Sequence, residues 1–265
     1  MKVVILAGGR GSRLSEETYL KPKPMVEIGE APILWHIMKI YSYYGFNDFI
    51  ICCGYKGEMI KEYFMDYYMR ASDITINLCN NTSIIHENVT EPWKVTLADT
   101  GLNTNTAGRV KMIEKYVGRE PFLLTYGDGV SNVNINDVVD FHNKTGKIAT
   151  ITAAKPAGRW GNIVINDDTC MVEHFKEKEV VDSAWVNSGF SVFEPEFFDY
   201  LDDPMEQLEC EPYDKLTAAG EMNAYKHYGF WYPMDTVSDR QYLQSLWEAG
   251  NAPWRLWEYK SDRTK

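Results

Sequence analysis

The sequence lacks a hydrophobic run long enough to cross a membrane, and it lacks a framework of cysteines. No segment approaches the roughly 20 consecutive apolar residues of a membrane-spanning helix. The apolar start, Val3 to Ala7, is too short for a signal peptide. The five cysteines form no Cys-x-x-Cys pair and have no zinc-ligand spacing, which favours a reducing compartment. We therefore expect a cytoplasmic protein that contacts no membrane.

Basic residues are also scarce. The chain has 27 Lys and Arg against 38 Asp and Glu, a formal net charge of −11. That balance argues against nucleic-acid binding, but a local cationic pocket or a bound divalent ion could still hold a small phosphorylated ligand. With 265 residues, no internal repeat and no low-complexity linker, the sequence predicts a single domain over residues 1–265.

Short apolar runs alternate with helical patterns along the chain. We predict buried strands at 3–7, 49–53, 122–126 and 148–153, and helices with one apolar face at 33–41, 60–67 and 135–142. This alternation predicts parallel pairing in a layered α/β fold. Residues 80–108 are polar and turn-rich, which predicts a long excursion from the domain. We expect His36, Cys52, Cys53 and the C-terminal tryptophans 247, 254 and 257 to be packing residues.

A glycine-rich segment, Leu6 to Leu14, follows the first predicted strand directly. Three glycines allow a close approach of the backbone to phosphate oxygens. The segment lacks the Gly-Lys-Ser/Thr of a P-loop, and Leu14 stands where a dinucleotide fingerprint has its third glycine. A cationic series, Arg10, Arg13, Lys21 and Lys23, follows the first glycines and strengthens the prediction of a phosphate site.

Three further residues suit phosphate chemistry. Lys23 lies between two prolines that stiffen its backbone, which makes it a pre-positioned charge rather than a solvated surface lysine. Asp128 lies between two glycines at the carboxyl end of a predicted strand, and suits Mg²⁺ better than an Asx-turn. Asp235 is the best candidate for a second carboxylate, although spacing alone does not establish the pairing.

Two motifs and several longer stretches carry a resemblance to a known family. The motifs are residues 6–14 and 21–25, and the stretches are 32–38, 48–57, 91–97, 99–101, 106–109 and 229–236. Together they resemble the sugar-1-phosphate nucleotidyltransferases, and among these the enzymes that make CDP-glucose, over residues 1 to about 258. The resemblance implies a three-layer Rossmann-like nucleotidyltransferase fold with a mixed, mostly parallel central sheet.

The resemblance also implies roles for the matching residues. Nucleotide binding is implied for Leu6, Ala7, Gly8, Gly9, Arg10, Gly11, Ser12, Arg13 and Lys23, and for Thr104 and Arg109 supplied by a neighbouring subunit. Sugar-phosphate binding is implied for Glu177, Lys178 and Asn187, and Mg²⁺ binding for Asp128 and Asp235. Arg13, Lys23 and Asp128 are the implied catalytic residues. The chain departs from the family pattern at Glu179, where proline is usual, and at Ala107, where glycine is usual.

The implied reaction transfers a cytidylyl group from CTP to α-D-glucose 1-phosphate, giving CDP-glucose and pyrophosphate. Its nucleophile is an ionised phosphate, so catalysis needs positioning and charge neutralisation rather than a general base. The resemblance further implies a homo-oligomer, a trimer-based hexamer, that serves deoxysugar synthesis for surface polysaccharide. Two alternatives stay open: a transferase of this family with another base or sugar, and a binding or regulatory module without catalysis. The combination of Arg13, Lys23, Asp128, Lys178 and Asp235 disfavours the second alternative.

Overall fold

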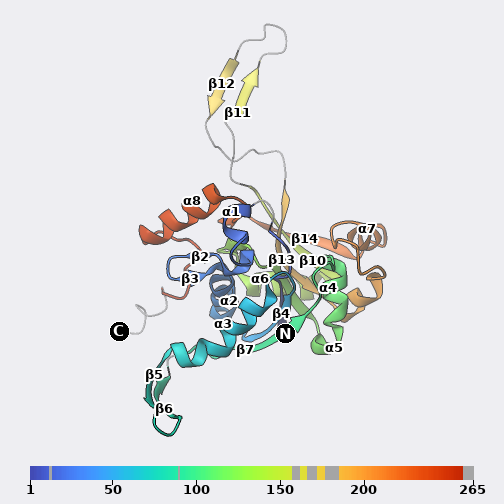
Figure 1. Cartoon of the computed structure of the whole chain (residues 1–265). Helices are drawn as coiled ribbons and strands as arrows, with labels where there is room; N and C mark the ends of the chain where they lie inside the picture. Colours follow the sequence, from blue (N-terminus) through green and yellow to red (C-terminus); the bar gives the residue numbers. More distant parts are fainter. Residues whose placement is uncertain (12–13, 89, 157–161, 166–171, 177–184, 259–265) are drawn as a thin grey trace.

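A seven-stranded sheet forms the centre of the computed structural model, which describes residues 1–11, 14–88, 90–156, 162–165, 172–176 and 185–258 (Figure 1). The strand order is β14-β10-β13-β8-β1-β4-β7. Only β13 runs antiparallel to its neighbours; the other four pairings are parallel, as expected for a mixed, mostly parallel sheet. The strands are β1 (Lys2–Leu6), β4 (Asp48–Cys53), β7 (Lys94–Asp99), β8 (Phe122–Tyr126), β10 (Ala149–Ala154), β13 (Val186–Phe193) and β14 (Met222–His227).

The sheet is covered on both faces, which gives the three layers predicted for this fold. Along β1, Val3 and Ile5 belong to one hydrophobic core, whereas Val4 and Leu6 belong to the other. Successive side chains of a strand point to opposite faces, so a run of four apolar residues is required here. The first core includes residues of α2 (Ile33–Tyr43), α3 (Gly57–Arg70), α6 (Ile135–Thr145) and α8 (Val237–Glu248). The second includes residues of α4 (Thr106–Met112), α5 (Glu114–Val117), η3 (Pro195–Tyr200) and α7 (Glu211–Ala218).

Local sequence explains where the covering helices begin and end. In α6, the Asn134 side chain accepts a hydrogen bond from the Asn136 amide at 3.1 Å, and Gly146 ends the helix in a left-handed conformation. In α8, Thr236 and Asp239 form a reciprocal capping box. The predicted helices at 33–41, 60–67 and 135–142 are confirmed as α2, α3 and α6.

Two hairpins project from the body, from opposite ends in Figure 1. The first pairs β5 (Ser72–Asn77) with β6 (Thr82–Asn88), and the second pairs β11 (Asn162–Ile165) with β12 (Val172–Lys176). The excursion predicted for 80–108 is therefore wrong in its bounds. Only its first part projects, because Lys94–Asp99 pairs with β4 as the edge strand β7 and Thr106–Met112 packs as α4 on the sheet.

Several short elements complete the described structure. They are α1 (Ser15–Thr18), η2 (Lys23–Met25), the pair β2 (Glu27–Ile28) with β3 (Ala31–Pro32), and the pair β9 (Gly129–Ser131) with β15 (Trp231–Pro233). In the described part of the chain, no helix has the length and apolar character needed to span a membrane. Cys52, Cys53, His36 and Trp254 are all buried, as expected, and Trp247 and Trp257 pack against the first core.

Candidate active site

Parallel strands end together at one edge of the sheet, and a cavity of about 460 Å³ opens there. β1, β4 and β8 run parallel, so their carboxyl ends at Leu6, Cys53 and Tyr126 lie side by side. This edge is where open α/β sheets bind ligands, and the volume suits a nucleotide-sized molecule. The described lining is Leu6, Ala7, Gly8, Gly9, Gly11, Lys23, Pro24, Thr104, Asn105, Thr106, Arg109, Tyr126, Gly127, Asp128, Glu209 and Asp235.

The glycine-rich loop is held by backbone hydrogen bonds that continue past the ends of the strands. The Ala7 amide donates to the Cys52 carbonyl at 3.1 Å, and the Gly127 amide donates to the Leu6 carbonyl at 3.0 Å. Gly11 has φ +62°, a conformation that favours glycine. A side chain at Gly9, in contrast, would meet no atom within 4 Å, so the space above Gly9 belongs to the cavity.

Position 8 requires glycine because the buried cation of Arg109 lies beside it, and not because of its backbone φ angle. A Cβ atom at Gly8 would lie 2.1 Å from Nη1 of Arg109. The Arg109 guanidinium donates to the carbonyls of Gly8 at 3.1 Å, Gly101 at 2.8 Å and Cys53 at 3.3 Å, and to Oγ1 of Thr100 at 2.7 Å. Arg109 is only 4% exposed, and burial lowers the pKa of its guanidinium. The cation is therefore stabilised by neutral dipoles, and it fixes the backbone of the glycine-rich loop.

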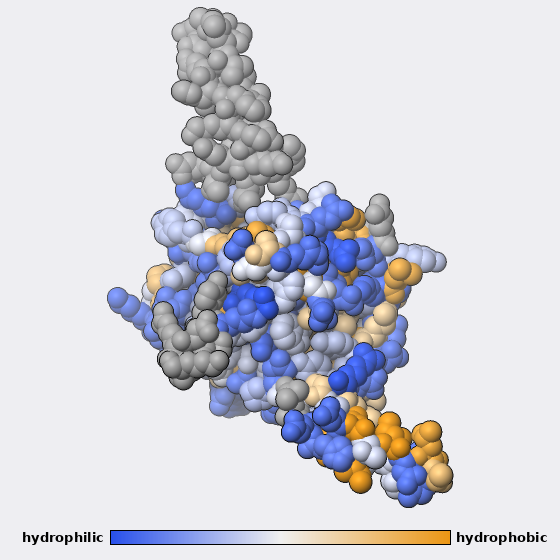
Figure 2. Space-filling view, turned by 90° about the vertical axis from the view of Figure 1, so that its left-hand side faces the viewer, coloured by the Kyte–Doolittle hydropathy of each residue, from blue (hydrophilic) through white to orange (hydrophobic). Residues whose placement is uncertain are grey.

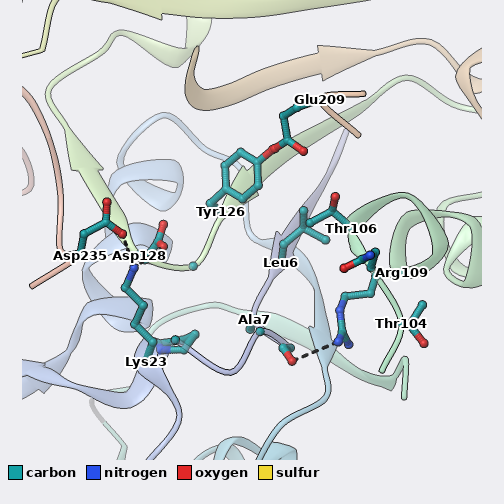
Figure 3. Close-up of a pocket in the computed structure, with 16 residues that line it drawn as sticks. Leu6, Ala7, Lys23, Thr104, Thr106, Arg109, Tyr126, Asp128, Glu209 and Asp235 are labelled. Atoms are coloured by element: carbon teal, nitrogen blue, oxygen red, sulfur yellow. Dashed lines mark hydrogen bonds and ion pairs between the residues drawn. The ribbon is translucent and has the colours of Figure 1, made fainter. Parts of the chain in front are cut away.

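Thr104 and Arg109 are the two residues for which the resemblance implies supply by a neighbouring subunit. Thr104 and Arg109 line the cavity of their own chain, from the loop before α4 and from α4 itself (Figure 3). The physical reason is the packing of α4, because Ala107 and Val110 are buried in the second core of the same chain. The departure from the family pattern at Ala107 is accommodated there, since its side chain is fully buried among apolar residues.

At the other end of the cavity, the structure brings Lys23, Asp128 and Asp235 together (Figure 3). Nζ of Lys23 lies 2.7 Å from Oδ2 of Asp128 and 2.8 Å from Oδ1 of Asp235. Burial alone disfavours the charged lysine, but attraction to the two carboxylates outweighs it and raises the pKa of Lys23. The pairing of Asp128 with Asp235, which spacing could not establish, follows from the register that places Gly129 opposite Pro233 in the β9–β15 pair.

A neighbouring carboxylate fixes the backbone that carries Asp235. Oδ2 of Asp239 accepts hydrogen bonds from the amides of Asp235 at 3.1 Å and Thr236 at 2.8 Å. Oδ1 of Asp239 accepts from the Tyr232 hydroxyl at 3.1 Å. At the end of the β9–β15 pair, the Met234 amide donates to the Asp128 carbonyl at 2.8 Å. Both carboxylates therefore project from braced backbone, a requirement for a preorganised cation site.

The two carboxylates fit a divalent cation that takes few protein ligands. Their oxygens already converge on one positive charge, the ammonium of Lys23. Among the described residues, no group of three or more His, Cys, Asp or Glu side chains could hold a metal. A pair of carboxylates suits Mg²⁺, which keeps several waters or phosphate oxygens as its other ligands. The described lining has two cations, Lys23 and Arg109, against three carboxylates, so a polyphosphate needs added positive charge here.

Sequence reasoning missed Tyr126 and Glu209, which form the cavity wall opposite the glycine-rich loop. The Tyr126 hydroxyl donates to the carboxylate of Glu209, and burial raises the pKa of Tyr126. Glu209 belongs to a segment tied to α4, where the Leu208 amide donates to Oγ1 of Thr106 at 2.9 Å. Tyr126 ends the strand next to Gly127-Asp128 and could have been suspected. Glu209 lies more than 80 residues farther along the chain, and no local pattern points to it.

Several expected site residues lie outside this lining. Arg10 donates to Oδ1 of Asn103 at 3.4 Å on the surface. Asn187 is on β13, where its Oδ1 accepts from the Gly189 amide at 2.9 Å, and it is absent from the described lining. Ser12, Arg13, Glu177 and Lys178 lie outside the described residues.

Comparison with known proteins agrees with this geometry. The sequence model of the family described as "Nucleotidyl transferase" matches residues 2–251. A glucose-1-phosphate cytidylyltransferase of Salmonella typhimurium is 52% identical over 259 residues, covering 97% of this chain and all of the relative. A UTP–glucose-1-phosphate uridylyltransferase of Synechocystis is 27% identical over 83% of this chain and 56% of the relative. The crystal structure of HddC from Yersinia pseudotuberculosis superposes with a TM-score of 0.66 at 20% identity, over 93% of this chain and 99% of that one.

Proposed function

Since this chain belongs to the nucleotidyl transferase family, we propose that it transfers a cytidylyl group from CTP to α-D-glucose 1-phosphate. The products are CDP-glucose and pyrophosphate. The observation that carries this choice is the 52% identity, over the full length of the relative, to a glucose-1-phosphate cytidylyltransferase. The uridylyltransferase relative is far less similar, at 27%. The cavity at the carboxyl ends of β1 and β8 supports the proposal, because it joins a glycine loop to a cluster of charged groups.

In the proposed reaction, a phosphate oxygen of glucose 1-phosphate attacks the α-phosphorus of CTP. The new P–O bond forms as the bond to the bridging oxygen of pyrophosphate breaks, and no proton has to be removed from the nucleophile. The backbone around Gly8 and Gly9, which Arg109 stabilises, would bind the nucleoside end. Lys23 would contact phosphate oxygens and offset negative charge in the transition state. Arg13, Lys178 and Glu177 are proposed to assist on the phosphate and sugar side, and Asn187 to contact the sugar.

Asp128 and Asp235 would hold Mg²⁺, the cofactor of the proposed reaction. When bound there, the ion would neutralise charge on the nucleotide phosphates. The rest of the chemistry belongs to the chain: the glycine loop orients the nucleotide, and the braced β9–β15 pair holds the two carboxylates at a fixed place relative to it. Positioning of this kind is sufficient because the reaction requires no protein nucleophile.

The test is release of pyrophosphate in the presence of Mg²⁺ and glucose 1-phosphate, with CTP, UTP, dTTP, ATP and GTP assayed separately. We expect release with CTP at a kcat/KM at least tenfold above that with each other nucleotide. A preference for another nucleotide would keep the reaction class and overturn the choice of base. Failure with all five nucleotides, repeated with galactose 1-phosphate and mannose 1-phosphate, would favour the alternative of a binding module.

We also propose that the chain forms a homo-oligomer, a trimer-based hexamer, with its first hairpin as a contact surface. We define the arm as residues 65–85, which are the end of α3 and most of the β5–β6 hairpin. Its exposed apolar side chains are Met65, Tyr68, Met69, Ile76, Leu78, Ile84 and Ile85, and Figure 2 shows apolar residues gathered at the end of this projection. An isolated two-stranded hairpin is marginally stable in water, so packing against a partner would stabilise it.

Charge favours a second copy of this chain as the partner. The whole chain has a net charge of −11, so two copies repel each other wherever acidic surfaces meet. The arm contains only Asp66, Arg70 and Asp73 as charged residues and is nearly neutral. We expect light scattering to give a mass several times 30.5 kDa, and the double variant Leu78→Glu/Ile84→Glu to give a smaller one. Tyr228→Glu, at another exposed apolar residue, is the matched control, and an unchanged mass of the double variant would refute this surface.

The proposed compartment is the cytoplasm. Cys52, Cys53, Cys79 and Cys210 are all unpaired thiols, and Cys79 and Cys210 are exposed. Exposed free thiols are typical of proteins in reducing compartments. Fractionation of cells that produce the protein tests this proposal, and a disulfide-linked secreted form would contradict it.

A further inference from the structure

The ammonium group of Lys23 occupies the position between the two carboxylates that the proposed function gives to a metal ion. Lys23 is 8% exposed, and its Nζ lies 2.7 Å from Asp128 and 2.8 Å from Asp235. The three side chains come from separate places in the chain, namely η2, the end of β8 and the end of β15. Their meeting therefore results from tertiary structure rather than from local sequence.

The position is suited to one cation at a time. An Mg²⁺ ion binds carboxylate oxygens at about 2.0–2.1 Å, so an ion shared by Asp128 and Asp235 would lie between the same oxygens that Nζ contacts. An ammonium and a divalent cation within such a distance of each other would repel strongly. The lysine side chain has four rotatable carbon–carbon bonds, so Nζ can leave while the backbone between Pro22 and Pro24 stays in place.

The other cation of the described lining cannot perform this role. The Arg109 guanidinium is held by three backbone carbonyls and a hydroxyl at the far end of the cavity. Within the described lining, Lys23 is therefore the cation that contacts both carboxylates.

We propose that the ammonium of Lys23 exchanges with a divalent ion. It bridges Asp128 and Asp235 in the metal-free protein, and it is released toward the nucleotide phosphates when the two carboxylates bind the ion. Lys23 is then a positioning residue for the metal-free site and becomes a phosphate-contacting residue only after the exchange. A consequence is that the metal must compete with Lys23, which weakens its binding when no nucleotide is present. This inference rests on the metal site of the proposed function, and the two experiments below can fail separately from it.

The first experiment measures the reactivity of lysine side chains in the wild-type protein without nucleotide. The protein is treated briefly with acetic anhydride, either in EDTA or in saturating MgCl2, and modification of each lysine is followed by mass spectrometry. We expect Lys23 to react at least fivefold faster in Mg²⁺, because its ammonium has lost both carboxylates. Lys21, which pairs with Glu27 at 3.2 Å, is the internal control and should react equally in both conditions. An unchanged rate at Lys23 under saturating Mg²⁺ would overturn the exchange.

The second experiment measures Mn²⁺ binding by electron paramagnetic resonance in the wild type, Lys23→Met and Lys21→Met, again without nucleotide. We expect Lys23→Met to bind Mn²⁺ at least tenfold more tightly than the wild type, and Lys21→Met to change the affinity less than twofold. Equal affinities of the wild type and Lys23→Met would overturn the exchange but leave the metal site standing. Absence of saturable binding in both would remove the metal site itself, and the exchange with it. Far-ultraviolet circular dichroism of each variant checks that the fold is retained.

Discussion

The buried imidazole of His36 should make the stability of this protein depend on pH. His36 is fully buried on α2, and Nε2 lies 2.8 Å from the Ile28 carbonyl, while the Trp254 indole donates to Nδ1 at 3.4 Å. The neutral ring thus donates at one nitrogen and accepts at the other. Protonation would place a second N–H against the indole N–H of Trp254, and burial lowers the pKa of His36 to about 4.

The sign and size of the effect follow from the two pKa values. The unfolded chain binds a proton at this histidine below pH 6.5, whereas the folded protein does so only near pH 4, so stability falls as the pH is lowered between these values. Each pH unit in the window costs about 1.4 kcal/mol, so lowering the pH from 6.5 to 5 costs about 2 kcal/mol from this residue alone. From about one pH unit above 6.5 upward, the residue contributes almost no pH dependence, because the histidine is then neutral in both states.

The assay is urea unfolding followed by tryptophan fluorescence at pH 7.5, 6.0 and 5.0, at fixed ionic strength and protein concentration. The variant His36→Gln keeps an N–H donor for Ile28 and removes the titrating group. It should be less stable at pH 7.5, since ring contacts with Trp247 and Trp254 are lost, but should lose about 2 kcal/mol less on acidification than the wild type. His86→Gln, at an exposed histidine, should retain the wild-type slope. Equal losses in the wild type and His36→Gln would refute the reasoning.

Three predictions concern the cavity. Asp128→Asn should abolish pyrophosphate release while shifting the melting temperature by only a few degrees, because a proposed metal ligand is lost and no core residue changes; near-normal turnover would contradict the metal assignment. Gly8→Ala should displace the Arg109 guanidinium and weaken CTP binding at least tenfold in calorimetry. The comparison variant is Gly45→Ala, where a Cβ atom meets open space but the backbone φ of +93° is strained, so that it tests strain without this clash. Arg109→Lys should destabilise the fold by about 2–3 kcal/mol in urea unfolding, because one ammonium cannot satisfy four spread acceptors; a loss below about 0.5 kcal/mol would argue against this role.

Most of the fold could be predicted because burial dictates it residue by residue. The run Val3 to Leu6 can only be a strand covered on both faces, and the apolar spacing from Ile33 to Tyr41 matches one face of α2. The edge strand β7 was missed because most of its residues are only half-buried or exposed and it lies within a polar region, so its local signal is weak. Its place in the sheet depends on pairing with β4, a tertiary contact.

The candidate site was predictable where its residues lie in glycine- or proline-bounded motifs. Gly8, Lys23 and Asp128 are of this kind, and the structure brings all three to one cavity. Glu209 could not be predicted, because the fold brings it from a distant loop. The contacts that hold Arg109 at the cavity could not be predicted for a related reason. Its partners are mainly backbone carbonyls, which leave no trace in the side-chain pattern of the sequence.

The two cations of the described lining, Lys23 and Arg109, differ in the kind of partner that holds them, and this difference separates their roles. Lys23 is held by two carboxylates, and a divalent cation can bind these carboxylates in its place. Arg109 is held by the neutral carbonyls of Gly8, Cys53 and Gly101 and by the Thr100 hydroxyl. A ligand that brings a divalent ion can therefore redistribute the charge at the Lys23 end of the cavity while the Arg109 end keeps its shape. The Arg109 end of the cavity, proposed for the nucleoside, is thus fixed before the ligand binds. The Lys23 end, proposed for the reacting phosphates, is assembled when the ligand binds.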